Sequence, residues 1–112
     1  MLYNAAVDVF NALADPTRRK IMEMLANSGP LSASDIYNQF QVSPPAISQH
    51  LKILRQAQLV RMEKQAQQRI YRINPEAMLE LEDWARRLSQ LWTERFDALE
   101  QLLETEKKKL VS

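Results

Sequence analysis

Three pairs of a polar residue and a proline divide this chain into helical segments. The pairs are Asp15-Pro16, Ser43-Pro44 and Asn74-Pro75. Asp, Ser and Asn are good N-cap residues, and proline is tolerated in the first turn of a helix because its missing N–H would have no partner there. Each pair therefore predicts the start of a helix. The only glycine of the chain, Gly29, precedes Pro30, which predicts that the helix from residue 16 ends near residue 28.

The spacing of apolar residues within these segments predicts a mainly α fold with about five helices. The expected helices cover about 1–14, 16–28, 32–40, 44–57 and 75–109. In the third of them, Ser32 and Asp35 have the spacing of a capping box. Only a tight turn at Gln41 and Val42 separates this helix from the next. Two short helices joined in this way predict a helix-turn-helix over 32–57.

A β-hairpin is expected over 59–73, after the helix-turn-helix. Val60 and Met62 alternate there with Arg61 and Glu63, and this period of two is typical of a strand. Residues 65–68 between the two strands include no Gly, Asn or Asp, so we expect a loose tip and not a tight turn. The whole chain, 1–112, is therefore predicted to be one winged helix-turn-helix domain with a two-stranded wing.

Positive charge is concentrated in the segment that should read DNA. Residues 43–72 contain six Lys or Arg residues and one Glu, a net charge of +5, whereas the whole chain carries +1. Residues 74–112 are acidic, with nine Asp or Glu residues and six Lys or Arg residues. A local excess of cations of this kind indicates a surface for phosphates, so the predicted partner is double-stranded DNA.

The helix expected over 44–57 has two distinct faces. Ile47, Leu51 and Leu54 form an apolar stripe that should be buried. The opposite face presents Pro45, Ser48, Gln49, Lys52 and Gln56. Hydroxyl and amide side chains suit base edges in the major groove, while Lys64 and Arg69 in the hairpin could reach the backbone or the minor groove. The alternative is that these are ordinary solvated residues on a surface helix.

The last helix is too long for one small domain to cover. About 34 residues without a helix breaker would extend roughly 50 Å, with an apolar stripe along the whole length. We expect a second copy of the chain to cover that stripe. The predicted dimerisation residues on the stripe are Leu81, Trp84, Leu88, Trp92, Phe96 and Leu99. The alternative is a helix that packs wholly within its own subunit.

Several functional classes are excluded by composition. The chain has no cysteine and one histidine, which leaves no disulfide, no thiolate metal site and no cysteine nucleophile. No glycine-rich phosphate loop or catalytic constellation is present, so we expect neither an enzyme nor a cofactor. Because no apolar run is long enough to cross a bilayer and no signal peptide is recognisable, we expect a cytoplasmic protein without membrane insertion.

Three segments resemble the ArsR-type winged-helix repressors of bacteria: LADPTRRKIMEML at 13–25, VSPPAISQHLKILRQAQLV at 42–60 and RIYRINPEAM at 69–78. The resemblance implies a homodimer that binds an inverted-repeat operator and represses its own operon, with the helix over 44–57 as recognition helix and His50 among its contacts. It also implies that the helices over 1–14 and 75–109 make the dimer, which adds Phe10 to the predicted dimerisation residues. The candidate DNA-binding residues are then Ser43, Pro45, Ser48, Gln49, His50, Lys52, Arg55, Lys64, Gln68 and Arg69.

The chain differs from the metal sensors of that family at the positions that hold their cysteines. Ser32 and Ser34 stand there, and hydroxyl groups are poor ligands for thiophilic metals. We therefore expect a member of the non-metal-sensing branch, with a partner protein or a small apolar ligand as the candidate signal. The alternative function is a winged-helix adaptor that binds a protein partner and not DNA.

Overall fold

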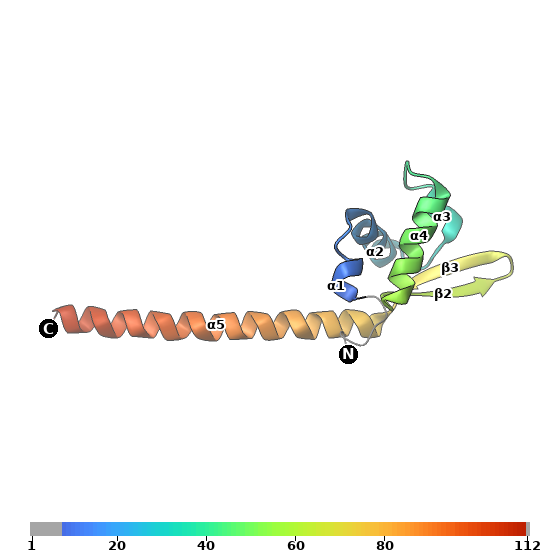
Figure 1. Ribbon diagram of the computed structural model, residues 1–112. Coiled ribbons are helices and arrows are strands. Elements are labelled where there is room, and N and C mark those ends of the chain that lie inside the picture. Colours follow the sequence, from blue (N-terminus) through green and yellow to red (C-terminus); the bar gives the residue numbers. More distant parts are fainter. Residues whose placement is uncertain (1–7, 112) are drawn as a thin grey trace. The chain divides into compact units, whose positions relative to one another are not determined.

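The computed structural model describes residues 8–111 and divides into two units, one up to residue 80 and one from residue 81 onward. The elements are α1 (Val9–Ala12), α2 (Pro16–Ser28), β1 (Leu31–Ser32), α3 (Ala33–Tyr37), α4 (Pro44–Gln56), β2 (Val60–Gln65), β3 (Gln68–Ile73) and α5 (Pro75–Val111) (Figure 1). The prediction of a mainly α winged helix-turn-helix with a long last helix is confirmed.

The predicted helix starts are confirmed by their caps. The carboxylate of Asp15 accepts hydrogen bonds from the backbone N–H groups of Thr17 and Arg18, at 2.8 and 3.2 Å. Ser43 accepts one from Ala46 at 3.4 Å. At the end of α2, Gly29 has a φ of 81°, a left-handed conformation that a residue with a Cβ rarely adopts.

Helix α1 is shorter than the spacing of its apolar residues predicted. It ends at Ala12 and not near residue 14, because the chain must leave the helix to reach the cap at Asp15. Val9 and Ala12 are buried, whereas 36% of the surface of Phe10 is exposed. The predicted part of this helix that precedes residue 8, including Ala6, lies outside the described residues.

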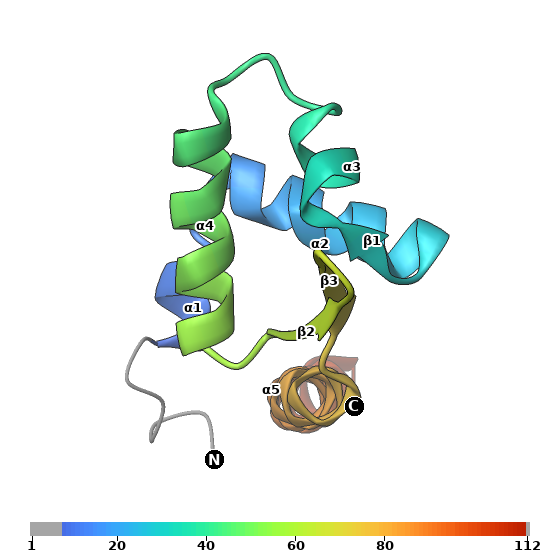
Figure 2. The same cartoon turned by 90° about the vertical axis from the view of Figure 1, so that its right-hand side faces the viewer.

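The sheet has three strands in the order β1-β3-β2, one more than predicted. Strand β1 has two residues, pairs with β3 through Leu31↔Tyr71 and Ser32↔Ile70, and leads directly into α3 (Figure 2). A strand of two residues has no periodicity, and it forms only because a partner strand lies beside it. The sequence pattern therefore could not predict it.

The hairpin tip is a tight two-residue turn, so the expectation of a loose tip was wrong. Gln65 and Gln68 are paired across the strands, which leaves only Ala66 and Gln67 between them. Ala66 has a φ of 56°, in the left-handed region that usually belongs to Gly, Asn or Asp. Pairing of the strands up to their last residue imposes the turn on a sequence without the usual turn residues.

The core lies where α2, α3 and α4 meet the sheet. Its largest fully buried side chains are Ile21, Ile36, Ile47, Leu51, Leu54 and Leu59. The predicted buried stripe of α4 is thus confirmed. Asn74, which precedes α5, is also buried, and it donates from Nδ2 to the carbonyl of Gln58 while its Oδ1 accepts from the N–H of Glu76. This side chain fixes the junction between the hairpin and α5.

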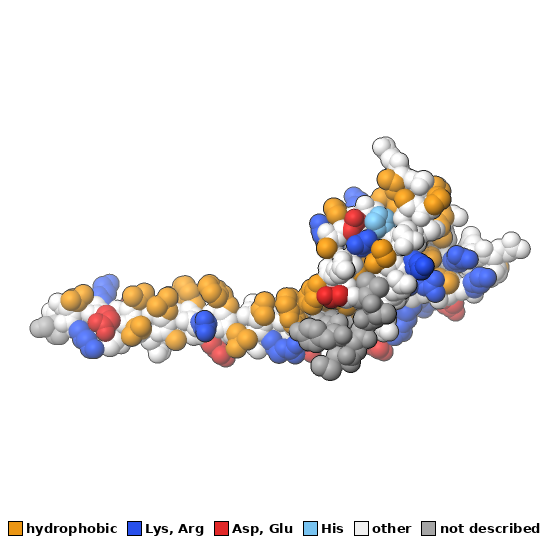
Figure 3. Space-filling model, viewed as in Figure 1, with side chains coloured by type: hydrophobic (Ala, Val, Ile, Leu, Met, Phe, Trp, Pro, Cys, Tyr) orange, Lys and Arg blue, Asp and Glu red, His pale blue; other side chains and the backbone are white. Residues whose placement is uncertain are grey.

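Helix α5 has 37 residues, which corresponds to about 55 Å at about 1.5 Å per residue. Hydrophobic side chains follow one another along it (Figure 3). They recur every eleven residues, as in the sets Leu81, Trp92, Leu103 and Leu88, Leu99, Leu110. A repeat of eleven residues corresponds to about 3.67 per turn, close to the α-helix itself. The stripe therefore stays on one side of the helix over its whole length.

Candidate nucleic-acid interface

The exposed face of α4 carries the residue types that read bases. Pro45, Ser48, Gln49 and Lys52 are exposed and lie opposite the buried stripe of α4. Proline and small polar side chains occupy the first two turns, so the helix can approach a surface closely there. Ser43 caps the helix immediately before them. The face predicted from the helical spacing is therefore present on the surface.

Ser48 is held by a residue that the sequence analysis missed. The hydroxyl of Tyr37 in α3 lies 2.7 Å from Ser48 Oγ. A serine hydroxyl rotates freely by itself, and a fixed neighbour restricts the directions in which it can donate or accept. No pattern in a single sequence indicates this pair, since its members are eleven residues apart on two different helices.

The inner face of the hairpin continues from the core into a pair of cations. The facing pairs Val60↔Ile73, Met62↔Tyr71 and Lys64↔Arg69 alternate with the pairs of the other face, so they share one side of the sheet. Val60 and Tyr71 are buried, whereas Lys64 and Arg69 are exposed. These two cations lie directly opposite each other across the strands, an arrangement that destabilises a sheet unless an anion is near.

The outer face of the hairpin carries a second pair of facing cations, but acids neutralise it. Arg61 and Arg72 face each other. Arg72 forms an ion pair with Glu63, and Arg61 lies 3.5 Å from a carboxylate oxygen of Glu76. By contrast, no ion pair with any residue between 8 and 111 is formed by the cations of α4 and of the inner face, which are Lys52, Arg55, Lys64 and Arg69.

Helix α4 and the hairpin together form one concave surface. A groove is lined by Pro45, Ser48, Gln49, Lys52, Arg55, Arg69 and Tyr71. Figure 3 shows Lys and Arg side chains gathered over the hairpin. Of the candidate DNA-binding residues, Ser43, His50, Lys64 and Gln68 do not line this groove. Lys64 and Gln68 are exposed toward the tip of the hairpin, and Ser43 is exposed at the start of α4.

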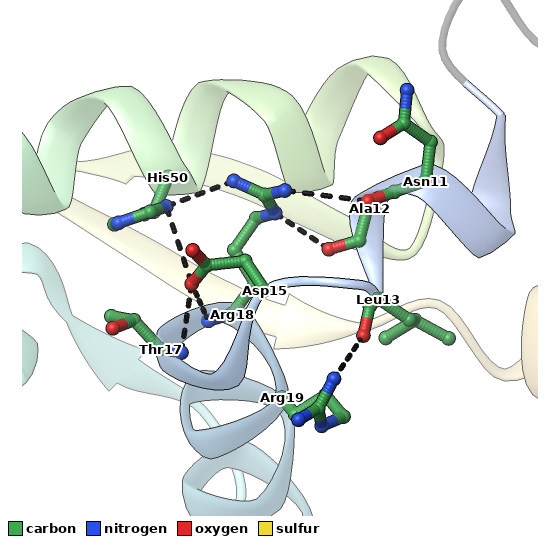
Figure 4. A network of polar contacts seen from close by, with 8 residues as sticks. All are labelled: Asn11, Ala12, Leu13, Asp15, Thr17, Arg18, Arg19 and His50. Atoms are coloured by element: carbon green, nitrogen blue, oxygen red, sulfur yellow. Dashed lines mark hydrogen bonds and ion pairs between the residues drawn. The ribbon is translucent and has the colours of Figure 1, made fainter.

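His50 is turned away from the groove and toward α2 (Figure 4). Its Nδ1 lies 3.0 Å from a terminal nitrogen of Arg18 and 4.0 Å from Asp15 Oδ1. The helical spacing gives a signal for this position, because His50 follows Ile47 by three residues and precedes Leu54 by four. It therefore lies beside the buried stripe and not with Gln49.

The carboxyl group of Asp15 is the acidic member of this cluster. Burial raises its pKa, but the N–H donors of Arg18 and Thr17, the charge of His50 once that ring is protonated, and the charge of Arg18 outweigh burial. The pKa of Asp15 therefore lies below its usual value. A carboxylate that caps a helix and faces cations remains ionised to low pH. Asp15 is therefore a stable negative charge beside His50.

The second candidate surface is the apolar stripe of α5. Within the unit from residue 81 onward, Leu88, Phe96 and Leu99 are each about half exposed, and Trp92 is 70% exposed. Leu81 and Trp84 are partly buried. Large hydrophobic side chains in so long a row are unusual on a surface that only meets water.

Between residues 8 and 111, no three His, Asp or Glu side chains are grouped closely enough to bind a metal ion. No helix in the same part of the chain has the length and hydropathy that a membrane span requires.

Comparisons with known sequences point to one family of regulators. The family of bacterial regulatory proteins called the arsR family matches residues 15–62. The HTH-type transcriptional regulator Rv2034 of Mycobacterium tuberculosis is 36% identical over 104 residues, which cover 93% of this chain and 94% of that protein. The transcriptional repressor SdpR of Bacillus subtilis is 39% identical over 77 residues, covering 69% of this chain and 84% of SdpR.

Two solved structures have a similar fold. An ArsR-like transcriptional regulator from Rhodococcus sp. RHA1 superposes with a TM-score of 0.72 at 31% identity, covering 84% of this chain and 88% of its own. HlyU from Vibrio cholerae has a TM-score of 0.57 at 36% identity, covering 65% of this chain and 82% of its own.

Proposed function

The chain belongs to the ArsR family of bacterial regulatory proteins and is a DNA-binding transcriptional regulator, and on this basis we propose that it acts as a homodimeric repressor. Its operator is an inverted repeat, and one such operator controls its own gene. Helix α4 enters the major groove, and the hairpin contacts the adjacent backbone. The protein does this work in the cytoplasm, where the DNA is.

The distribution of ion pairs on the hairpin carries this proposal. Two pairs of cations face each other across the strands, and only the outer pair, Arg61 and Arg72, has acidic partners. The inner pair, Lys64 and Arg69, has none within residues 8–111 and lies on the side of the groove. Two adjacent cations without a counter-charge favour a bound anion, and the phosphates of DNA supply one at regular spacing.

Helix α4 supplies the sequence preference. Gln49 can donate to and accept from a single adenine, and the hydroxyl of Ser48 suits several base edges. Both are exposed on the groove. Lys52 and Arg55 lie on the same groove and suit the flanking phosphates. Contacts to bases and contacts to the backbone therefore come from adjacent positions of one helix.

The apolar stripe of α5 supports the dimer. Leu88, Trp92, Phe96 and Leu99 are half exposed or more. Burying an aromatic or leucine side chain contributes roughly 1.5–3 kcal/mol. A second copy related by two-fold symmetry would cover the stripe, with the exposed ring of Phe10 in α1 as a further contact. The same symmetry would present two α4 helices to half-sites about one helical turn apart.

We propose a signal other than a metal. Ser32 is buried and caps α3 by accepting the N–H of Asp35 at 3.1 Å, so its hydroxyl has a structural role. Hydroxyls bind thiophilic metals poorly. Zinc, cadmium or arsenite at stoichiometric concentration should not release the protein from DNA, and release by any of them would contradict this part of the proposal. A partner protein or a small apolar ligand is the remaining class of signal.

Selection of duplexes from a random library by the purified protein tests the proposed function. We expect an inverted repeat to be enriched. The affinity of the protein for this repeat, measured by fluorescence anisotropy, should fall as the salt concentration rises. A plot of the logarithm of affinity against the logarithm of salt concentration should have a slope on the order of −4 to −8. A flat salt response, or no enriched sequence, would contradict the proposal. Failure to bind any duplex would favour the alternative, in which the exposed stripe of α5 binds a protein partner and the chain acts as an adaptor.

A further inference from the structure

The side chain of Arg18 joins three elements of the fold. From its place in α2, its Nε donates to the carbonyl of Ala12 at 2.5 Å and one terminal nitrogen donates to the carbonyl of Asn11 at 3.3 Å. The other terminal nitrogen lies 3.0 Å from Nδ1 of His50 in α4 (Figure 4). One planar guanidinium thus connects the end of α1 with the middle of α4.

The contact between Arg18 and His50 requires a neutral imidazole. A guanidinium has donors and no acceptor. Nδ1 of His50 must therefore accept the hydrogen bond, and the ring proton must be on Nε2. If Nδ1 also carried a proton, two donors and two positive charges would face each other at 3.0 Å. Protonation of His50 therefore breaks this connection.

Among residues 8–111, the charged groups within 4.0 Å of the His50 imidazole are both on α2. One is Arg18, and the other is Asp15, whose Oδ1 lies 4.0 Å from Nδ1. A protonated ring would be repelled by the first and attracted by the second. Since Asp15 already caps α2 through Thr17 and Arg18, a change of partner would move His50 and not the cap.

His50 directly follows Gln49, which is exposed on the groove. The buried stripe of α4 holds one side of the helix, and the hydrogen bond at His50 holds a second side next to it. The hydrogen bond between Tyr37 and Ser48 is a further constraint on α4. Losing the hydrogen bond at His50 leaves the helix less firmly fixed, and a side chain that reads a base must be placed within a fraction of an ångström. Loss of the hydrogen bond at His50 should therefore weaken contacts with bases more than contacts with the DNA backbone.

We propose that Arg18 is a positioning residue that fixes α4 relative to the end of α1 while His50 is neutral, so that acidification weakens the preference for the operator. The inference rests on the proposed function, because it takes α4 as the recognition helix. His50 is the only histidine of the chain, so an imidazole that gains a proton on acidification can only be this one.

Arg19 provides a matched control for Arg18. It is the next residue of α2 and also donates to the end of α1, from a terminal nitrogen to the carbonyl of Leu13 at 2.8 Å. Among residues 8–111 it forms no hydrogen bond or ion pair with α4. Arg18→Met and Arg19→Met remove the same charge and comparable contacts with α1. They differ in the connection to His50.

The experiment compares a duplex selected by the wild-type protein with a scrambled duplex, by anisotropy at about pH 5.5 and 7.5. For the wild type, the ratio of the two affinities should fall about tenfold on acidification, equivalent to about 1.4 kcal/mol. Affinity for the scrambled duplex should not fall, since the protein gains positive charge. Arg18→Met should show the lowered ratio at both pH values, whereas Arg19→Met should follow the wild type.

His50→Asn tests the inference even if Arg18→Met does not fold. The amide oxygen of the new asparagine replaces Nδ1 as an acceptor and does not titrate, so the ratio of the affinities for the selected and scrambled duplexes should be the same at both pH values. Equal behaviour of Arg18→Met and Arg19→Met, or a pH response that persists in His50→Asn, would overturn the inference and leave the proposed function intact. A wild type that prefers no duplex at either pH would overturn both.

Discussion

Replacing Lys64 should weaken DNA binding without destabilising the protein. Lys64 and Arg69 face each other on the exposed inner face of the hairpin and have no acidic partner within the described residues. In the free protein, Lys64→Gln removes a like-charge contact, which should leave the free energy of unfolding unchanged or raise it by about 0.2–1 kcal/mol. In the complex, the same substitution removes one phosphate contact from each subunit.

The magnitude follows from counterion release. Each phosphate contact contributes about 0.9 to the log–log salt slope, so two lost contacts should lower it by about 1.8. Between about 50 and 200 mM salt, this difference corresponds to roughly a tenfold smaller loss of affinity. Anisotropy titrations on the selected and scrambled duplexes should give the same decrease, because backbone contacts do not depend on sequence.

Arg72→Gln is the matched control on the same hairpin. Arg72 also faces another arginine, but it forms an ion pair with Glu63, so it is already neutralised before DNA arrives. Its replacement should change the salt slope by less than about half of the Lys64 effect. If Arg72→Gln lowers the slope as much as Lys64→Gln, or if Lys64→Gln markedly lowers the midpoint of urea unfolding, the sorting of cations into free and neutralised pairs is wrong.

Three further substitutions test other parts of the structure. Gln49→Ala should lose about 1–3 kcal/mol of discrimination at one base pair of each half-site, measured against singly substituted duplexes; an equal loss on every sequence would argue against base reading. Phe96→Asp should convert the dimer to a monomer in sedimentation velocity, because each buried aromatic side chain contributes about 2–3 kcal/mol and the two-fold dimer contains it twice. The circular dichroism of residues 16–73 should not change, and a wild type that is monomeric at micromolar concentration would contradict the expectation. The lowered pKa of Asp15 means that its charge stabilises the fold above about pH 4 and that this stabilisation is lost as the pH falls through the folded-state pKa. The free energy of urea unfolding of Asp15→Asn should therefore differ from that of the wild type at neutral pH and converge with it in acid; a difference independent of pH would contradict this.

The helix starts could be predicted because a cap and a following proline act within a few residues. Asp15 and Ser43 cap their helices as the sequence indicated. Strand β1 and the tight turn at Ala66 depend on pairing with β3 and β2. Since such pairing joins segments far apart in the chain or overrides the local turn preference, no short pattern indicated either of them.

The candidate site shows the same division between local and long-range information. The excess of cations over 43–72 could be counted from the sequence, but which of them remain available depends on the face of the hairpin and on Glu76, which lies beyond it. The orientation of His50 depends on Arg18, 32 residues away in the chain. Charge content was therefore predictable, whereas the pairing that decides its use was not.

Footprinting of the complex on the selected duplex, together with a mass measurement of the same complex, tests whether a dimer reads DNA with α4. A two-fold dimer that reads DNA with α4 should protect two patches about 10 base pairs apart on one face of the duplex, with two chains bound. Substituting Gln49 should alter the protection in both patches alike. A single protected patch with one chain bound, or uniform protection without sequence preference, would contradict the account.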